Sequence, residues 1–187
     1  QDSCLWLHEF RTDLPDNLPR EATAQSLACV REAMQVLWRG EVEADVFNRL
    51  VTLLPCRWRE AHLFRTISAW LRQAGFPLSP TAQADALTRY PAIGRALWEL
   101  FQIRFDPGFA GDRKTRAALA AGQVVSMLET VESLADDRIL RQYLAVIQAM
   151  TRTSYFRTDA AIRHRLSFKI DPRGVPDVPL PCPWREI

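Results

Sequence analysis

The sequence predicts a mainly α-helical fold, a bundle of about seven helices with short flanking β-strands at both ends. Through the middle of the chain, apolar residues recur at steps of three and four, the spacing of one helix face. Proline and glycine divide this pattern into segments, and two-residue alternation occurs near the ends. With 187 residues and 48% hydrophobic content, the chain can bury about 70% of its unfolded surface. We therefore expect one domain, or one and a half.

A short strand and a long helix are the first expected elements. Residues 5–7 with Phe10 predict the strand, and residues 15–19, bounded by two prolines, predict a turn or linker. The helix ends near Gly40, because glycine favours helix C-termini. Its predicted core face consists of Leu27, Val30, Met34, Leu37 and Trp38.

The second and third helices have shorter apolar faces. The second ends at Pro55, and the third ends at Gly75, which supplies a left-handed residue. Their predicted core residues are Phe47, Leu50, Val51 and Leu54 in the second helix, and Leu63, Phe64, Ile67, Trp70 and Leu71 in the third.

Prolines set the limits of the fourth and fifth helices. Ser79 before Pro80 predicts an N-cap with proline at the first helical position, so residues 81–89 form a short helix. Tyr90 precedes Pro91 and is excluded from the helical region, which separates the two helices. The fifth helix ends at Asp106 and presents Ile93, Leu97, Leu100, Phe101 and Phe105 to the core.

Two longer helices complete the predicted bundle. One runs over residues 113–134, and the other begins at Asp136 and Asp137, whose charges complement the positive end of a helix dipole. The expected core residues are Leu119, Val124, Leu128 and Val131 in the first of these helices, and Ile139, Tyr143, Val146, Ile147 and Met150 in the second.

The C-terminal part of the chain predicts a strand followed by a stiff connection. Leu166, Phe168 and Ile170 alternate with polar residues, which predicts a strand with one buried face. Five prolines then predict an extended segment close to polyproline II, and residues 184–187 begin another strand. Because the first residue is not Met, we expect the chain to be a piece of a longer protein. The prolines are Pro172, Pro176, Pro179, Pro181 and Pro183.

Composition argues against several functional classes. The net charge of +2 gives no overall attraction to nucleic acid or anionic membranes, and no apolar run reaches the length of a membrane helix. Four separated cysteines without a CxxC pair argue against zinc or a redox dithiol, so we expect reduced thiols and a cytoplasmic protein. These cysteines are Cys4, Cys29, Cys56 and Cys182.

We expect no catalytic, cofactor-binding or metal-binding residue in this chain. The three histidines have no Ser or Cys neighbour in a nucleophile motif, and no glycine-rich phosphate loop occurs. Two pairs of neighbouring carboxylates are expected at helix starts, where dipole complementarity accounts for them. The histidines are His8, His62 and His164, and the carboxylate pairs are Glu41 with Glu43 and Asp136 with Asp137.

Two local clusters have alternative interpretations. A basic cluster beside Tyr155 and Phe156 is typical of single-stranded nucleic-acid binding, but the small net charge and the lack of a recognisable RNA-binding module favour an Arg-rich helix end and solvated loop. The spacing of Pro176 and Pro179 suits docking in an aromatic groove, but we favour a connector that packs on its own protein. The basic cluster is Arg152, Arg157, Arg163, His164, Arg165, Lys169 and Arg173.

Several sequence words resemble the large bacterial NAD-specific glutamate dehydrogenases. They occur in that family's order and spacing and span most of the chain, so together they are far more specific than any one of them. The words are FNRL (47–50), WRE (58–60), WLRQAGFPLS (70–79), LFQIRFDP (100–107), RTSYF (152–156) and LSFKIDPRGVPDVPLPCPWREI (166–187). Ser154, residues 55–57 and Cys182 depart from the family pattern, which indicates a divergent member.

The resemblance implies a division of the chain and a parent reaction. Residues 1–12 would end an ACT-like regulatory module, residues 13–157 would form a helical domain, and residues 158–187 would supply a first strand and a connector into the catalytic domain. The parent would oxidise L-glutamate to 2-oxoglutarate and ammonia with NAD, as a homo-oligomer. Its catalytic lysines, aspartate and dinucleotide motif match no residue here, so the fragment alone should be inactive. The alternatives are a helical scaffold that binds a protein through Trp38, Trp58, Trp70 and Trp98, or an Arg-rich nucleic-acid-binding domain.

Overall fold

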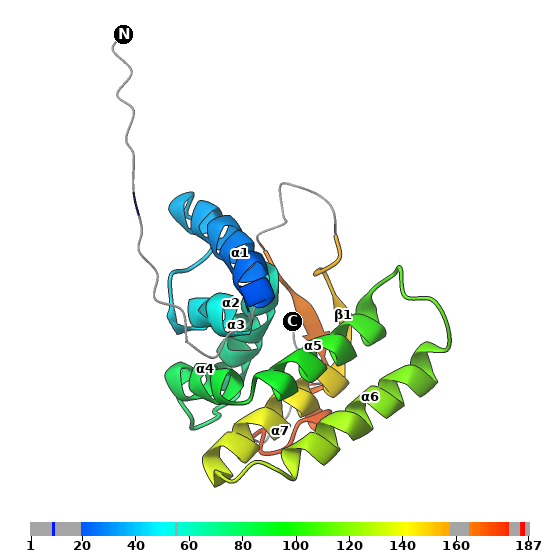
Figure 1. Ribbon diagram of the computed structural model, residues 1–187. Helices are drawn as coiled ribbons and strands as arrows, with labels where there is room; N and C mark the ends of the chain where they lie inside the picture. Colours follow the sequence, from blue (N-terminus) through cyan, green and yellow to red (C-terminus); the bar gives the residue numbers. More distant parts are fainter. Residues whose placement is uncertain (1–8, 10–19, 55, 158–164, 180–183, 186–187) are drawn as a thin grey trace.

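Seven α-helices and one two-stranded antiparallel sheet make up the described part of the chain, which confirms the predicted mainly α-helical class (Figure 1). This computed structural model describes residues 9, 20–54, 56–157, 165–179 and 184–185. Outside these residues lie the strand expected at residues 5–10 except residue 9, the linker at 15–19, and half of the strand expected at 184–187.

Helix α1 (Arg20–Trp38) ends where predicted but buries a different face. Ser26, Cys29, Ala33 and Val36 face the core, whereas Trp38 is 74% exposed and Leu27 is 51% exposed. The predicted face of Leu27, Val30, Met34, Leu37 and Trp38 was therefore wrong: its three central members are only half-buried. Small side chains let α1 approach α2 and α3 closely, so the bulkier stripe turns outward.

The second and third helical segments bury the predicted residues. A 3-10 turn, η1 (Val46–Asn48), leads into α2 (Arg49–Leu53), and α3 spans Trp58–Gln73. Asp45 caps η1 by accepting a 2.9 Å hydrogen bond from the Phe47 amide. Gly75 adopts the predicted left-handed conformation, with φ of +80°. All nine predicted core residues of these segments are buried.

Helices α4 (Pro80–Arg89) and α5 (Pro91–Phe105) confirm the capping prediction. The Ser79 hydroxyl accepts a 3.2 Å hydrogen bond from the Ala82 amide. Tyr90, with φ of −118° and ψ of 65°, separates the two helices. Of the predicted α5 face, Ile93, Leu97, Leu100 and Phe101 are buried and Phe105 is half-buried.

Helix α6 (Arg113–Leu128) is shorter than predicted, and α7 spans Leu134–Ala149. The chain turns after Leu128, where the Thr130 hydroxyl donates a 2.8 Å hydrogen bond to the Met127 carbonyl. Ser133 then caps α7 by accepting a hydrogen bond from the Asp136 amide, so Asp136 and Asp137 lie in the first turn as predicted. Leu119 was expected in the core but is exposed, because α6 contributes only one narrow face.

The strand predicted around Phe168 pairs with a strand that the sequence did not predict. Strand β1 (Met150–Thr153) continues directly from α7, and β2 (Phe168–Ile170) runs antiparallel to it, with Met150 opposite Ile170. The register shifts between Met150 and Arg152. Met150 was expected in the last helix; it is buried, but as the first residue of β1.

The segment after β2 is not fully extended, contrary to the polyproline II prediction. Residues Pro172–Gly174 form a 3-10 turn, η3, that packs on α7. Asp171 caps this turn, because its side chain accepts a hydrogen bond from the Arg173 amide. Asp177 has a positive φ of 61°. A capped proline at the first position therefore starts a helical turn here, as it does in α4.

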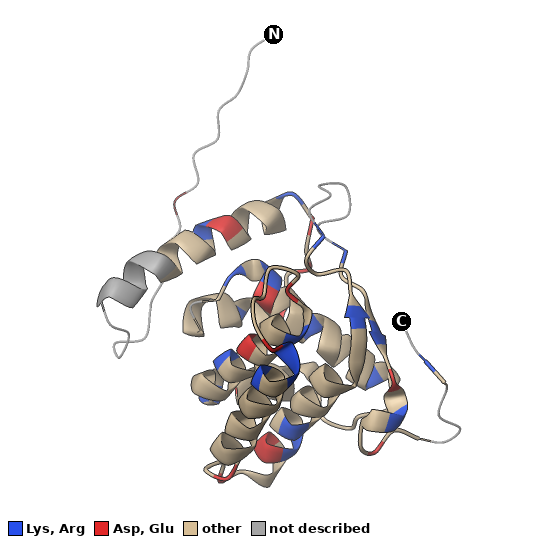
Figure 2. Ribbon diagram, turned by 90° about the vertical axis from the view of Figure 1, so that its right-hand side faces the viewer, with Lys and Arg blue, Asp and Glu red and all other residues tan. Residues whose placement is uncertain are grey.

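Helix α7 lies at the centre of the packing, against α4, α5, α6 and η3. Tyr143, Val146 and Ile147 are fully buried there. Arg104 of α5 ties this region to the sheet by donating hydrogen bonds to the Gln148 carbonyl at 3.0 Å and the Met150 carbonyl at 2.9 Å. Over the described residues, basic and acidic side chains are distributed across the helices rather than gathered on one face (Figure 2).

Candidate functional site

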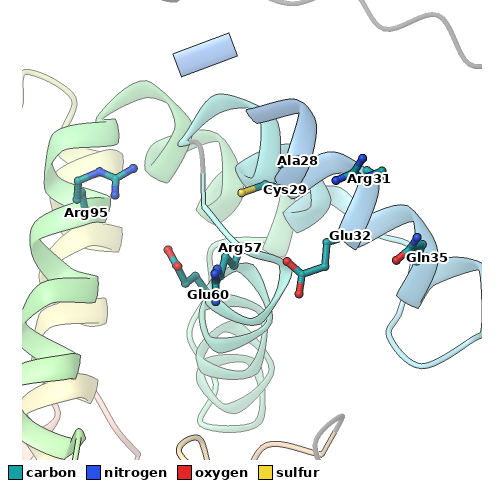
Figure 3. Close-up of a pocket in the computed structure, with 8 residues that line it drawn as sticks. All are labelled: Ala28, Cys29, Arg31, Glu32, Gln35, Arg57, Glu60 and Arg95. Carbon is teal, nitrogen blue, oxygen red and sulfur yellow. The ribbon is translucent and has the colours of Figure 1, made fainter. Parts of the chain in front are cut away.

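A polar groove runs across the N-terminal end of α3, between α1 and α5. It comprises two adjoining hollows of about 690 Å³ and about 760 Å³ that share Glu32, Arg57 and Glu60. The first hollow is also lined by Ala28, Cys29, Arg31, Gln35 and Arg95 (Figure 3), and the second by Trp58, Arg59, Trp98, Gln102, Tyr155, Phe156 and Arg157.

Helical periodicity places these side chains on facing walls. On α1, Ala28, Glu32 and Gln35 follow at steps of four and three, and on α5, Arg95 and Gln102 lie seven residues apart. The first residues of α3 form the floor between these walls. In Figure 3, Arg57 lies between the carboxylates of Glu60 and Glu32.

Glu60 has a structural role at this helix start. Glu60 follows the N-cap residue Arg57 by three positions. A hydrogen bond from the backbone of Arg57 favours the charged form of the Glu60 carboxyl. This arrangement is half of a capping box. Burial nevertheless raises the pKa of the Glu60 carboxyl, because the effect of desolvation exceeds those of this hydrogen bond and of the nearby Arg95 and Arg57 charges.

Aromatic rings form the wall of the second hollow. The Arg59 guanidinium lies over the Tyr155 ring, with its Cζ atom 4.6 Å from the ring centroid, and donates a hydrogen bond to the Tyr155 carbonyl. The Trp98 ring packs against Tyr155 at 5.2 Å between centroids, and Phe156 stacks on Phe101 at 5.9 Å. The Trp58 indole donates a 3.0 Å hydrogen bond to Glu32. These contacts fix the groove wall without filling the groove.

The groove is suited to binding rather than to nucleophilic chemistry. Burial raises the pKa of the Cys29 thiol, with Glu32 and Glu60 adding to the effect, and burial raises the pKa of the Cys56 thiol strongly. A neutral, buried thiol is a poor nucleophile. The arginines instead provide positive charge and several hydrogen-bond donors.

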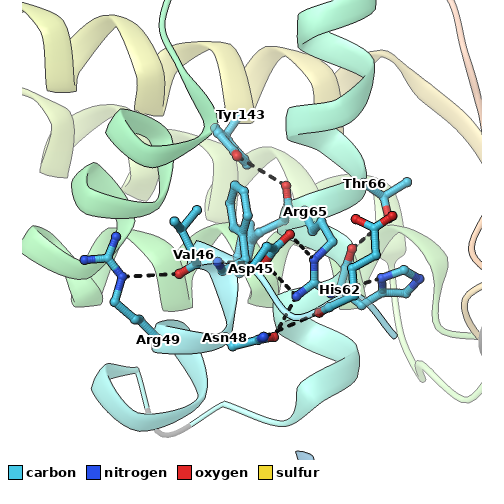
Figure 4. A network of polar contacts seen from close by, with 11 residues as sticks. Asp45, Val46, Asn48, Arg49, His62, Arg65, Thr66 and Tyr143 are labelled. Carbon is cyan, nitrogen blue, oxygen red and sulfur yellow. Dashed lines mark hydrogen bonds and ion pairs between the residues drawn. The ribbon is translucent and has the colours of Figure 1, made fainter. Parts of the chain in front are cut away.

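A second polar cluster, shown in Figure 4, fixes η1 to α3. Arg65 is only 8% exposed, and its guanidinium donates to both carboxylate oxygens of Asp45, at 2.6 Å and 2.8 Å. It also donates a 2.7 Å hydrogen bond to the Asn48 side chain, and its Nη1 lies 3.4 Å from His62 Nδ1. Because its members bind one another, the cluster stabilises the packing of η1 on α3.

The other residues singled out in the sequence lie apart from one another. His62 belongs to the Arg65 cluster, while His8, His164, Cys4 and Cys182 lie outside the described residues. Glu41 and Glu43 were wrongly expected at a helix start: they lie in the loop after α1, and Asp45 is the capping residue. Asp136 and Asp137 lie at the start of α7 and pair with Arg89 and Arg141, respectively.

The basic cluster of the sequence is divided by the sheet. Arg152 and Lys169 are opposite one another in the β1–β2 pairing, whereas Arg173 pairs with Asp171 at 2.9 Å. Arg157 alone reaches the groove, while exposed Arg165 is absent from its lining and Arg163 lies outside the described residues.

The four tryptophans and the proline pair singled out in the sequence lie in different parts of the structure. Trp58 is 3% exposed and Trp70 is 6% exposed, so these two belong to the core rather than to an exposed docking face. Trp38 is exposed at the end of α1, and Trp98 is half-buried in the groove wall. The Pro176 carbonyl accepts a 3.0 Å hydrogen bond from Gln142, in agreement with a connector that packs on its own protein.

Within the described residues, no group of three or more His, Cys, Asp or Glu side chains could hold a metal ion. None of the helices in the described part of the chain is long and apolar enough to cross a membrane.

Sequence reasoning missed the groove as a site, although it named several of its residues. Trp58 and Arg59 belong to one of the family-like words, and Arg157 belongs to the basic cluster. The available signal was the polar spacing on α1 and α5, because residues at steps of three, four and seven share one face. That signal does not show that the two faces meet across α3.

Two family models match the chain. Residues 42–107 match glutamate dehydrogenase, helical motif 3, and residues 123–187 match the catalytic domain of bacterial NAD-glutamate dehydrogenase. The NAD-specific glutamate dehydrogenases of Halomonas elongata and Mycobacterium tuberculosis are 35% and 36% identical to the chain over 100% and 98% of its length. The Pseudomonas aeruginosa protein of the same description is 31% identical over 97%. In each case the chain spans 12% of the relative's length.

Proposed function

Because the chain belongs to the bacterial NAD-glutamate dehydrogenase family, we propose that it is a non-catalytic helical region of such an enzyme. The proposed parent reaction is the oxidation of L-glutamate to 2-oxoglutarate and ammonia, with NAD as the hydride acceptor. The chain holds the regulatory modules against the catalytic core and aids assembly. Residues 123–187 match the family's catalytic-domain model, but we expect the catalytic and NAD-binding groups themselves to lie elsewhere in the polypeptide.

One observation supports this role above the others: the segments matched by the two family models share a core. The Tyr143 hydroxyl in the second segment shares its one proton between two acceptors in the first, the Phe64 carbonyl and Gln83 Oε1. Arg89 in the first segment pairs with Asp136 in the second. A flexible tether would not need such contacts, so the arrangement suits a rigid mount for the catalytic domain.

Further parts of the proposal concern the whole enzyme. We place it in the cytoplasm as a homo-oligomer whose helical region contacts its own regulatory and catalytic domains, without nucleic-acid or membrane partners. Residues 1–12 end a regulatory module, residues 13–157 form the helical domain, and residues 158–187 lead onward. Although β2 lies beyond residue 157, it pairs with β1, so the connection starts from a fixed point on the helical domain.

The proposed reaction is tested with the full-length enzyme. Purified parent protein should reduce NAD only when L-glutamate is present, with NADP and a panel of other amino acids as controls. The chain of residues 1–187 alone should neither bind NAD nor turn over glutamate. Glutamate-dependent NADH production by this fragment would contradict the assignment, and a parent that oxidises a different substrate would refute the proposed reaction.

The mounting role needs a separate variant. In the full-length enzyme, Arg89→Ala leaves the carboxylate of Asp136, which is buried, without its partner across the two segments. We expect earlier thermal inactivation and a lower kcat with a similar KM for glutamate. Arg116→Ala, at an exposed arginine of α6, is the matched control. Equal behaviour of the two variants would argue against the mount.

A further inference from the structure

The groove across the start of α3 contains hydrogen-bond donors with no acceptor among the described residues. Its arginines Arg31, Arg57 and Arg157 form no ion pair or hydrogen bond there through their guanidinium groups, and neither the Trp98 indole nor the Gln102 amide forms a hydrogen bond. An unengaged guanidinium alone presents five N–H donors. The second hollow therefore presents several donors that no acceptor of the described residues engages, beside the carboxylates of Glu32 and Glu60.

Many arginines elsewhere on the protein are engaged. Arg65, Arg89 and Arg141 pair with carboxylates, and Arg104 and Arg113 donate to main-chain carbonyls. In the groove, Arg59 and Arg95 likewise donate to carbonyls, but Arg57 and Arg157 do not. These two arginines are exposed and line the hollow whose wall is aromatic. Their positions suit a ligand that brings its own negative charge.

We propose that the groove binds an acidic polypeptide segment from another region of the same enzyme. The inference rests on the proposed function, because the relatives extend far beyond the 12% of their length that this chain spans. In the bound state, carboxylates of that segment meet Arg57 and Arg157, and an apolar side chain packs on Trp98 and Phe156. Arg and Trp are the residue types that most often dominate protein interfaces.

The groove's own acids favour a protein segment over nucleic acid. Glu32 and Glu60 lie in the floor and wall beside Arg57, and a continuous phosphate backbone would be repelled by them. A peptide can place its carboxylates at the arginines and neutral or basic side chains at the two glutamates.

The groove's shape favours a segment over a small anion. Two hollows of about 690 Å³ and 760 Å³ join through three shared residues, so the groove extends well beyond the reach of one carboxylate or phosphate group. Both hollows are open and polar, whereas small-molecule pockets enclose most of their ligand. An extended segment can contact both at once.

Cross-linking in the full-length enzyme tests this proposal. Arg57→Lys and Arg157→Lys keep the positive charge but introduce amines that a zero-length carbodiimide couples to neighbouring carboxylates. The chain has only Lys114 and Lys169 of its own, so new cross-links are readily assigned by mass spectrometry. The control is Arg116→Lys on the exposed face of α6.

We expect both groove variants, but not the control, to form cross-links to Asp or Glu residues outside residues 1–187 of the same enzyme, at several-fold higher yield. Cross-links confined to this chain, or yields equal to the control, would overturn the proposal. So would suppression of the cross-links by sulfate, which does not react with the carbodiimide, or by single-stranded RNA at low concentration; either result would identify a small anion or nucleic acid as the occupant.

A charge reversal provides an independent measurement. The double variant Arg57→Glu, Arg157→Glu should increase hydrogen exchange of the cross-linked segment in the full-length enzyme, while exchange in α7 stays unchanged. An increase in α7 as well would indicate general unfolding and count against the proposal. Neither cross-linking nor hydrogen exchange requires catalysis. Failure of the groove proposal can therefore be told apart from failure of the proposed enzyme activity.

Discussion

Deleting the hydroxyl of Tyr143 should destabilise the protein, although the change removes one atom. The ring is fully buried between α3, α4 and α7, and burial raises the pKa of the phenol, so the hydroxyl stays protonated. It lies 3.2 Å from the Phe64 carbonyl and 3.1 Å from Gln83 Oε1. Gln83 is itself fully buried, so no solvent can replace the lost partner.

The magnitude of this effect follows from the group left behind. Tyr143→Phe leaves Gln83 Oε1 without its donor, and an unsatisfied buried polar atom costs about 1–3 kcal/mol. The free energy of unfolding should fall by that amount, measured by urea denaturation with an unchanged m value. Tyr90→Phe is the matched control, because Tyr90 is half-buried and its hydroxyl makes no hydrogen bond among the described residues. That variant should lie within about 0.5 kcal/mol of the parent.

A double-mutant cycle isolates the bond. In a Gln83→Leu background only the Phe64 carbonyl remains as an acceptor and no Gln83 oxygen is left unsatisfied, so Tyr143→Phe should cost clearly less than it does in the parent. A full penalty in that background would show that the effect does not pass through Gln83. A penalty below about 0.5 kcal/mol in the parent would refute the reasoning altogether.

Three further outcomes are expected. Arg65→Met leaves Asp45 unpaired at a largely buried site and should lower the free energy of unfolding by about 3 kcal/mol. Arg49→Met breaks an exposed pair with Asp85 and should lower it by at most about 1 kcal/mol, measured for both variants by urea denaturation. Equal losses would argue against the Figure 4 cluster as a stabilising unit. Burial raises the pKa of Glu60, so its contribution to stability is present below its unfolded pKa of about 4 and is lost as pH rises through the folded pKa. In thermal melts, Glu60→Gln should therefore lose less stability than the parent as pH rises from about 4; parallel curves would contradict this. In a Cys4→Ser, Cys29→Ser, Cys182→Ser variant, Cys56 should react with a disulfide reagent only on unfolding, and rapid labelling of the folded protein would show that Cys56 is not buried.

The sequence predicts those elements whose limits depend on local chemistry. Ser79 with Pro80, Tyr90 before Pro91, and Gly75 each act within a few residues of themselves, and the structure confirms all three. The apolar faces of α3 and α7 are also predicted correctly, because each helix has one continuous stripe of large apolar residues. Where one helix face is clearly the most apolar, that face is the one that packs against the core.

The remaining differences arise where two signals compete. Helix α1 offers a large apolar stripe and a face of small residues, and the small residues face the core because they permit close helix contact. Strand β1 is missed because Met150 continues the helical spacing of α7. Its strand conformation depends on pairing with β2, which follows 14 residues after β1 ends, and no local pattern reports that pairing.

The candidate groove could be predicted only in part. The spacing of the polar residues on α1 and on α5 is visible in the sequence. The position of Glu60, three residues after Arg57 at the start of α3, is visible as well. What places them together is the crossing of three helices that lie far apart along the chain. Periodicity identifies a face but not the partner of that face.

The two family models end and begin at positions that do not match any break in the packing, and this difference constrains how the chain can move. The two models are separated by residues 108–122, yet α5 before this interval packs on α6 and α7, which lie within or beyond it. Separating the segments there would expose Tyr143, Val146 and Ile147, which are fully buried, at roughly 1.5–3 kcal/mol for each large apolar side chain. A regulatory motion that bent the chain at this interval would have to offset that cost. A motion that moves α3 to α7 as one body would not, so we expect these helices to move together in the enzyme proposed above.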